Sequence, residues 1–329
     1  MVKIALIDSG IDVKQYRNSI VGGLSIEERG NSKKNISYNI KDNCGHGSQC
    51  ASVILKECSN VNFYIIKIFG NELNTSYLSL RMALEYLLKI DVDIINLSLS
   101  VNTSEERTGE LLDIFKKLRN QGKRIFCATP NDTKSFNYIK DYSFWNIAVD
   151  DSVNDMYIDE EKHQIYVNSL PYLHYYMDGQ HKLFGKSTSY ATAKVSGKYA
   201  LYMDKYGMDA SIKFKEKYRK FEKYICLDNP IRKKCFHNKE FKKILDVTKR
   251  VLEVNDEELI LNYSLFSSKI ACHEDFCYLL VKNIEDELEI DLKPYDHFSQ
   301  LDFITIYTLY ERIMGIRKEK GKCENIIST

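Results

Sequence analysis

The chain has 329 residues, which is enough for one large domain or two of ordinary size. Its 47 Lys and Arg residues nearly balance its 46 Asp and Glu residues, so the overall charge points neither to a nucleic acid nor to an anionic membrane as partner. A hydrophobic content of 44% is typical of a soluble globular protein.

The N-terminal residues MVKIALIDSG pass directly into an apolar run, without the apolar segment and cleavage site of a secretory signal. No apolar stretch in the sequence reaches the roughly 18 residues that suggest a membrane span. The nine cysteines are odd in number and scattered, without the paired spacing of metal-binding motifs. We therefore expect reduced thiols and a cytoplasmic location.

Short apolar runs alternate with helical patterns up to about residue 205. Four runs rich in Ile and Val predict buried strands at 3–7, 62–69, 92–99 and 124–129. Three segments with apolar residues at helical spacing lie between them, at 47–58, 77–90 and 106–122. This order predicts an α/β fold, with a parallel sheet flanked by helices on both faces.

The Tyr-rich segment 150–184 predicts hairpins and loops, with MDGQ as a turn. The next stretch, STSYATAKVSGKYALYM, predicts a helix that begins at its serines and threonine.

The charge pattern changes near residue 206. Residues 211–245 hold twelve Lys or Arg against four acidic residues, and 246–304 hold five against fourteen. We read 1–205 as one domain, 206–240 as a basic helical connector, 241–318 as a small helical domain, and 319–329 as a tail. The connector is either a solvated helix face or a docking surface for its acidic neighbour.

Four polar residues lie at the ends of predicted strands or at the starts of predicted helices. Asp8 follows the first strand and Asn131 follows the fourth, where each could also belong to an ordinary turn. His46 lies between two glycines at a helix start, and Ser189 lies in a stretch that could simply cap a helix. The carboxyl edge of an open α/β sheet is where active sites gather.

Taken together, the four residue types have a chemical meaning. A serine hydroxyl attacks only when an imidazole takes its proton, and a carboxylate must orient that imidazole. The oxyanion that forms needs donors such as an Asn amide and a backbone N–H at a helix start.

Residues 1–205 resemble the subtilisin-like serine proteases. LIDSGID is similar to the Asp motif of that family, GHGSQCAS to its His motif and STSYATAKVSG to its Ser motif. The resemblance implies Asp8, His46 and Ser189 as a catalytic triad, and Asn131, in ATPN, as the oxyanion donor.

The resemblance also implies a substrate-binding strand in IINLSLS and a pocket lined near ATPN. The residues expected to bind substrate are Ser98, Leu99, Ser100, Ala128, Thr129 and Pro130. The sequence departs from the family pattern at Ser100, Pro130, Ser187 and Ala193, which leaves the cleavage specificity open.

Two further features bear on the site. Asp8 lies so near the N-terminus that we expect neither an inhibitory prodomain nor a calcium-binding arm, and we expect no metal and no cofactor. Cys50, one turn after His46, is either a thiol near the site or a buried helix residue.

Residues 242–313 resemble an acyl carrier protein. The expected attachment serine for phosphopantetheine is absent, because that region reads IACHEDF. Cys272 or His273 could replace the serine, but we favour an acidic helical bundle used for docking.

Carrier-related modules without the serine resemble components of bacterial systems that make ribosomal peptide natural products. We therefore expect a cytoplasmic endopeptidase that cuts the leader from a precursor peptide, with the C-terminal module recruiting the substrate or a maturation protein. We expect neither nucleic acid nor membrane as partner. The alternatives are a catalytically silent peptide-binding scaffold and a general intracellular protease with an incidental tail.

Overall fold

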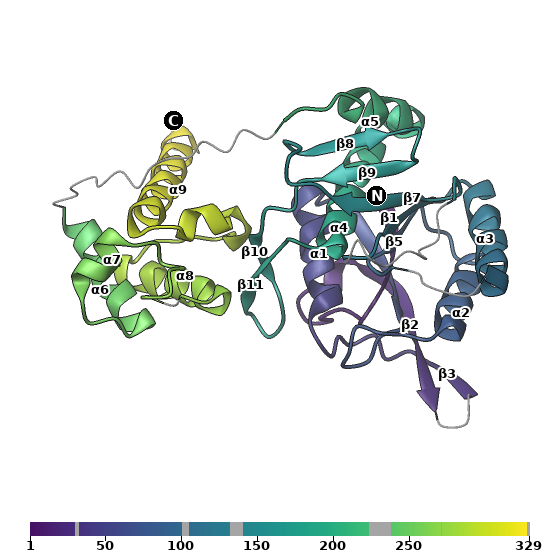
Figure 1. The fold of residues 1–329 in the computed structure, drawn as a ribbon, viewed down its shortest axis with the longest axis horizontal. Coiled ribbons are helices and arrows are strands. Elements are labelled where there is room, and N and C mark those ends of the chain that lie inside the picture. Colours follow the sequence, from purple (N-terminus) through teal and green to yellow (C-terminus); the bar gives the residue numbers. More distant parts are fainter. Residues whose placement is uncertain (30–32, 101–104, 132–140, 224–237, 271, 328–329) are drawn as a thin grey trace. The chain divides into compact units, whose positions relative to one another are not determined.

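The computed structural model describes residues 1–29, 33–100, 105–131, 141–223, 238–270 and 272–327 (Figure 1). The chain divides into two compact units. The first comprises Met1–Ser169, Tyr176–Gly179 and Gly185–Ile225, and the second comprises Leu170–Tyr175, Gln180–Phe184 and Cys226–Thr329.

The first unit is built on a nine-stranded sheet in the order β3-β2-β4-β1-β5-β6-β7-β9-β8. The inner strands β2, β4, β1, β5, β6, β7 and β9 each pair in parallel with the next. The edge strands β3 and β8 are antiparallel to their neighbours. The strands are β1 (Val2–Asp8), β2 (Ile20–Arg29), β3 (Lys33–Ser37), β4 (Val61–Lys67), β5 (Ile94–Leu97), β6 (Arg124–Ala128), β7 (Trp145–Val149), β8 (Met156–Asp159) and β9 (Gln164–Val167).

Helices cover both faces of this sheet (Figure 1). One face carries α2 and α3, whose apolar side chains share a core with alternate residues of the central strands, such as Ile7, Ile95 and Ile125. The other face carries α1 and α4, which pack against each other. The helices of this unit are α1 (His46–Glu57), α2 (Tyr77–Leu87), α3 (Glu105–Asn120), α4 (Thr188–Tyr206) and α5 (Ala210–Tyr218), with short 3-10 turns at Arg17–Ser19 and Gly207–Asp209.

The second unit is mainly helical, and its core also includes a β-hairpin. The antiparallel strands β10 (Tyr172–Tyr175) and β11 (His181–Phe184) contribute Leu173 and Leu183 to that core. Two backbone hydrogen bonds join β10 and the residue before it to the segment 298–300. The helices are α6 (Lys239–Leu252), α7 (Glu257–Asn262), α8 (Glu274–Leu288) and α9 (Ile306–Ile327), with 3-10 turns at Tyr295–His297 and Gln300–Phe303.

The predicted fold class is confirmed: the structure is α/β, with a large and mainly parallel sheet flanked by helices and with helices in the C-terminal part. The four predicted strands appear as β1, β4, β5 and β6, and the predicted helices between them as α1, α2 and α3. The predicted MDGQ turn is present, with left-handed backbone at Asp178 and Gly179. Strands β2 and β3 had no counterpart in the prediction, because their mixed polar sequence lacks a continuous apolar run.

The basic connector lies partly outside the described residues, since 224–237 are not among them. Its first part forms α5, and its last residues begin α6. Within the described part of the chain, no helix combines the length and the apolar character that crossing a membrane requires.

Candidate active site

Three neighbouring strands of the sheet end in polar residues at one edge. Asp8 is the last residue of β1, Ser98 follows the end of β5, and Asn131 stands three residues after the end of β6. Because β1, β5 and β6 are adjacent and parallel, these residues lie at their shared carboxyl edge. This is the edge at which α/β sheets bind their ligands.

The glycines around His46 allow α1 to begin close to β1. Gly45 caps the helix with a left-handed φ of 83°, and a Cβ there would stand 2.1 Å from the ring of Tyr176. At Gly47 a Cβ would stand 2.1 Å from the carbonyl oxygen of Gly10. The first residue of the helix, His46, is therefore held next to the end of β1.

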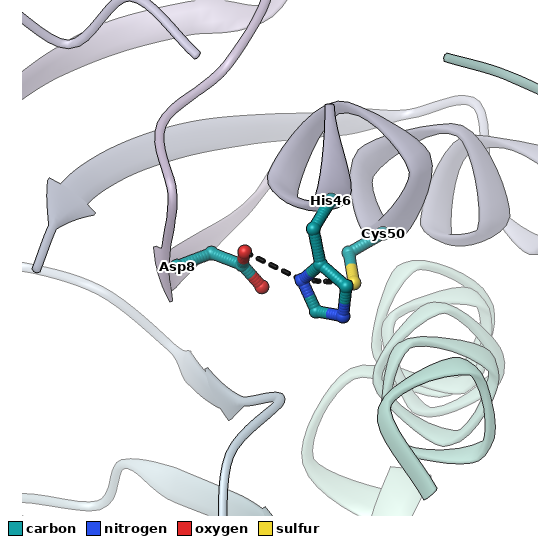
Figure 2. A group of neighbouring side chains, drawn as sticks. All are labelled: Asp8, His46 and Cys50. Atoms are coloured by element: carbon teal, nitrogen blue, oxygen red, sulfur yellow. Dashed lines mark hydrogen bonds and ion pairs between the residues drawn. The ribbon is translucent and has the colours of Figure 1, made fainter. Parts of the chain in front are cut away.

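His46 and Asp8 form a short hydrogen bond between Nδ1 and Oδ1, at 2.7 Å (Figure 2). The side chain of Asp8 is fully buried and that of His46 is 12% exposed. The same Asp8 oxygen accepts a hydrogen bond from the backbone N–H of Ser9 at 2.7 Å, while the other oxygen is buried without a hydrogen-bond partner among the described residues. Since a carboxylate only accepts, Nδ1 of His46 carries the hydrogen and Nε2 is left as the basic nitrogen.

Asp8 raises the pKa of His46. Burial is the largest effect and opposes the charged imidazolium, but the Asp8 carboxylate together with Cys50 outweighs it and holds the pKa well above its usual value. Cys50 Sγ lies 3.9 Å from His46 Nδ1 (Figure 2), and burial raises the pKa of this thiol. Cys50 is fully buried, and Asp8, 2.7 Å from His46 Nδ1, is the nearer of the two groups.

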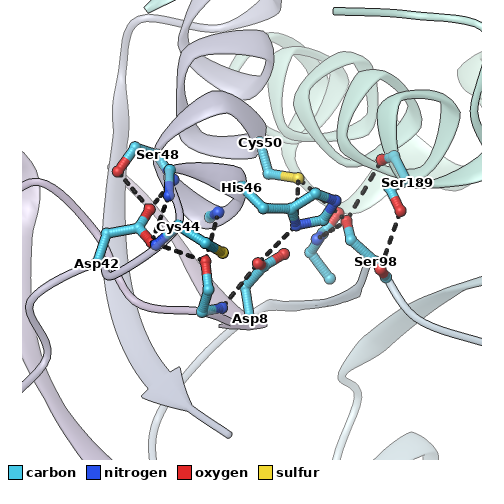
Figure 3. Close-up of polar contacts among 12 residues, drawn as sticks. Asp8, Asp42, Cys44, His46, Ser48, Cys50, Ser98 and Ser189 are labelled. Atoms are coloured by element: carbon cyan, nitrogen blue, oxygen red, sulfur yellow. Dashed lines mark hydrogen bonds and ion pairs between the residues drawn. The ribbon is translucent and has the colours of Figure 1, made fainter. Parts of the chain in front are cut away.

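Ser189 is the second residue of α4, and the helix is capped independently of it. The hydroxyl of Ser187 accepts a hydrogen bond from the N–H of Tyr190 and so serves as the N-cap. Ser189 is half-buried, and its own hydroxyl donates to the backbone carbonyl of Ser98 at 3.1 Å (Figure 3). Ser189 therefore has no capping role in α4.

Asn131 is held against the residue next to Ser189. Its Oδ1 accepts hydrogen bonds from the backbone N–H of Thr188 at 2.9 Å and from the Thr188 hydroxyl at 3.0 Å. Because the carbonyl end of the side chain is used in this way, its amide NH₂ remains as the donor end. Asn131 as a whole residue is exposed.

Sequence reasoning assigned no role to Asn96, which connects β5 to α4. Buried Asn96 donates to the hydroxyl of Ser98 at 2.8 Å and accepts a hydrogen bond from Ser196 of α4 at 2.8 Å. Ser98 in turn donates to the carbonyl of Ser189 and accepts from the thiol of Cys50. The sequence did hold a signal for this role, namely a single Asn within the apolar strand IINL, because a buried amide needs hydrogen-bond partners.

The predicted substrate-binding residues differ in exposure. Ser98, Ala128 and Thr129 are buried, and the Thr129 hydroxyl donates to the carbonyl of Ile147 at 3.0 Å. The remaining three are more open to solvent: Leu99 and Pro130 are half-buried and Ser100 is exposed.

The described residues include one group with the composition of a metal site. Ligand atoms of Asp8, His46 and Cys50 lie within 4.8 Å of one another. A metal bound through His46 Nδ1 would have to break the hydrogen bond to Asp8. The arrangement therefore fits an oriented acid–base pair better than a metal centre.

One comparison with known protein families bears on this part of the chain. No curated protein matches the chain. Residues 1–160, which include Asp8, His46, Asn96 and Asn131 but not Ser189, match the model of the Subtilase family (Peptidase_S8), and this match supports a serine peptidase.

Proposed function

We propose that the protein is a serine endopeptidase with Ser189 as nucleophile, His46 as general base and Asp8 as the residue that orients His46. The observation that carries the proposal is the 2.7 Å bond between Asp8 and His46. It lies in the same hydrogen-bonded network as the serine at the start of α4, through Cys50 and Ser98 (Figure 3).

Nucleophilic attack requires a change in one hydrogen bond. The Ser189 hydroxyl donates to the Ser98 carbonyl in this structure, and it must donate to His46 Nε2 before attack. Rotation of the serine about its χ1 bond would move the donor. His46 then takes the proton, and Asp8 stabilises the imidazolium that results.

The oxyanion would be held by two donors at the start of α4. The NH₂ group of Asn131 is one, because its Oδ1 is already used by Thr188. The backbone N–H of Ser189 is the other, because the first N–H groups of a helix have no acceptor within the helix. The positive end of the α4 dipole adds to this stabilisation.

The test is intact-mass analysis after incubation with a fluorophosphonate probe, which bonds to activated serines. We expect a single adduct on the wild type and none on Ser189→Ala. Ser187→Ala is the matched control, since it removes a serine two residues away that caps α4, and it should keep the adduct. A folded wild type that forms no adduct would instead favour the catalytically silent peptide-binding scaffold.

We further propose that the substrate is a ribosomally made precursor peptide whose leader is removed in the cytoplasm. In this proposal the second unit docks the substrate or another maturation protein. The support is the resemblance of residues 242–313 to a carrier protein that lacks its attachment serine, together with their excess of acidic residues. Cys272 is buried, which makes it a poor replacement for that serine.

Docking can be tested with the full chain by changing exposed residues of α8, for example Leu279→Ser with Asp286→Lys. A docking role predicts a higher KM for a full-length precursor and an unchanged KM for a short peptide that spans the cut. Unchanged values for both substrates would favour a general protease with an incidental C-terminal part.

A further inference from the structure

Asp42 is a buried carboxylate in the loop that precedes His46, and it is 3% exposed. One of its oxygens accepts hydrogen bonds from the backbone N–H groups of Cys44 at 3.1 Å and Gly45 at 2.9 Å. The other accepts from the backbone N–H of Ser48 at 2.9 Å and from its hydroxyl at 2.6 Å (Figure 3). These donors lie on both sides of His46 in the sequence.

Ser9 connects this loop to the end of β1. Its hydroxyl donates to Asp42 Oδ1 at 2.8 Å and accepts a hydrogen bond from the N–H of Gly47 at 2.9 Å. Its own backbone N–H donates to Asp8 Oδ1 at 2.7 Å, the oxygen that also bonds to His46. Asp42 therefore contacts the segments that carry both members of the acid–base pair, without contacting His46 itself.

A buried carboxylate is tolerated only where charge-assisted hydrogen bonds replace its hydration. The donors to Asp42 come from Ser9, next to Asp8, and from the loop and first turn around His46. If Asp42 served only the stability of this unit, partners in any neighbouring segment would suffice. The concentration of its partners around the pair indicates a role in the geometry of that pair.

Building on the proposed function, we propose that Asp42 is a positioning residue that holds the imidazole of His46 in register with the carboxylate of Asp8, with Ser9 as the bridge between the two segments. Asn at position 42 cannot replace the carboxylate. In either orientation its NH₂ group would face N–H donors, at Cys44 and Gly45 or at Ser48.

The experiment measures the imidazole titration of His46 by NMR in the wild type, Asp42→Asn, Ser9→Ala and Asp155→Asn. Among the residues that the structure describes, Asp8 on β1 and Cys50 on α1 are ionisable groups that face His46. If Asp42 positions the pair, Asp42→Asn weakens the Asp8 contact and the pKa of His46 falls toward its ordinary value. Ser9→Ala, which changes no charge, should shift the pKa in the same direction by less.

The matched control is Asp155→Asn. Asp155 forms ion pairs with Lys194 and Lys198 of α4 and makes none of the contacts of the His46 loop. Its loss should lower thermal stability and leave the His46 titration unchanged. The rate of fluorophosphonate labelling should fall on the order of tenfold to hundredfold in Asp42→Asn, because small displacements in an active site slow attack strongly.

An unchanged His46 titration in Asp42→Asn and Ser9→Ala would overturn the positioning role, and so would an equal shift in Asp155→Asn. If Asp42→Asn does not fold, Ser9→Ala decides alone. If the wild type forms no fluorophosphonate adduct, the proposed function fails, but the His46 titration still decides the role of Asp42.

Discussion

Gly47 packs directly against the carbonyl oxygen of Gly10, at a distance that leaves no room for a side chain. A Cβ on Gly47 would stand 2.1 Å from that oxygen and 3.2 Å from the Cβ of Asp8. The glycine that follows His46 therefore sets how closely α1 approaches the end of β1. The 2.7 Å bond between Asp8 and His46 depends on this approach.

Gly47→Ala should separate α1 from β1, because the clashing atom belongs to the backbone and cannot turn away. We expect a loss of about 1–3 kcal/mol in the free energy of unfolding, as in overpacked cores, and greatly reduced fluorophosphonate labelling. The measurement is urea unfolding followed by the fluorescence of Trp145, the single tryptophan, which lies in the first unit.

Gly109→Ala is the control for that substitution. Gly109 lies in α3 with nothing within 4 Å of an added Cβ, so alanine there should stabilise by about 0.5–1 kcal/mol. Equal stability of Gly47→Ala and the wild type would contradict the close-packing argument.

Asp8→Asn should change both the rate and the pH dependence of labelling. Without the carboxylate the pKa of His46 falls, so the labelling midpoint moves to lower pH. The limiting rate should drop on the order of 10³- to 10⁴-fold, because the imidazole loses its fixed tautomer. The rate of fluorophosphonate labelling across the pH range measures both effects, with Asp113→Asn on the exposed face of α3 as control.

The raised pKa of His46 also predicts that activity and stability change with pH in opposite directions in the wild type. A base must be neutral, so labelling should increase as pH rises through a midpoint above the ordinary histidine value of about 6.5. The ion pair with Asp8 stabilises the fold at pH values below about 6.5. This stabilisation is lost as the pH rises through the pKa of His46 in the folded protein. A midpoint at or below about 6.5 would contradict the assigned electrostatics.

Cys50 should resist alkylation in the folded protein. It is fully buried, and burial raises its pKa, so little thiolate is present at neutral pH. Peptide mapping after iodoacetamide treatment should show Cys44, which is half-buried, reacting at least about tenfold faster. Comparable rates at the two cysteines would mean that the thiol beside His46 is exposed or ionised.

Leu173→Asp should destabilise the second unit, although residue 173 lies sixteen positions before Ser189 in the sequence. Its side chain is fully buried in the core of that unit, so a charge there should cost about 3–5 kcal/mol. Hydrogen exchange of the α8 amides should speed up accordingly. Lys182→Ala, which removes an exposed ion pair on the same hairpin, should leave exchange nearly unchanged.

His163 should make the first unit sensitive to acid. Its ring stacks on Trp145 with 3.9 Å between centroids, and burial together with the charges of Arg119 and Lys215 lowers its pKa to about 4. Between pH values of about 4 and 6.5, His163 is protonated in the unfolded chain and neutral in the folded protein. The free energy of unfolding should therefore decrease by ~1–2 kcal/mol as pH falls from about 6.5 to 4. Urea unfolding followed by Trp145 fluorescence should show this slope in the wild type and not in His163→Gln.

Local patterns in the sequence were sufficient to predict the central strands of the large sheet and the helices between them. Continuous apolar runs predicted β1, β4, β5 and β6, and apolar spacing predicted the helices between them. Both signals depend on residues close in the chain, where the periods of 2 and 3.6 residues apply. The same patterns placed Asp8 at a strand end and His46 and Ser189 at helix starts, which is where the structure has them.

Tertiary structure alone decided which distant residues meet. Asn131 reaches Thr188 across 57 positions of sequence, and Ser9 reaches Asp42 across 33. The β10–β11 hairpin precedes α4 in the chain, yet its apolar side chains belong to the core of the second unit. Such contacts carry no local signature, because they arise only when separate segments bury their apolar faces together and their polar groups must then find partners.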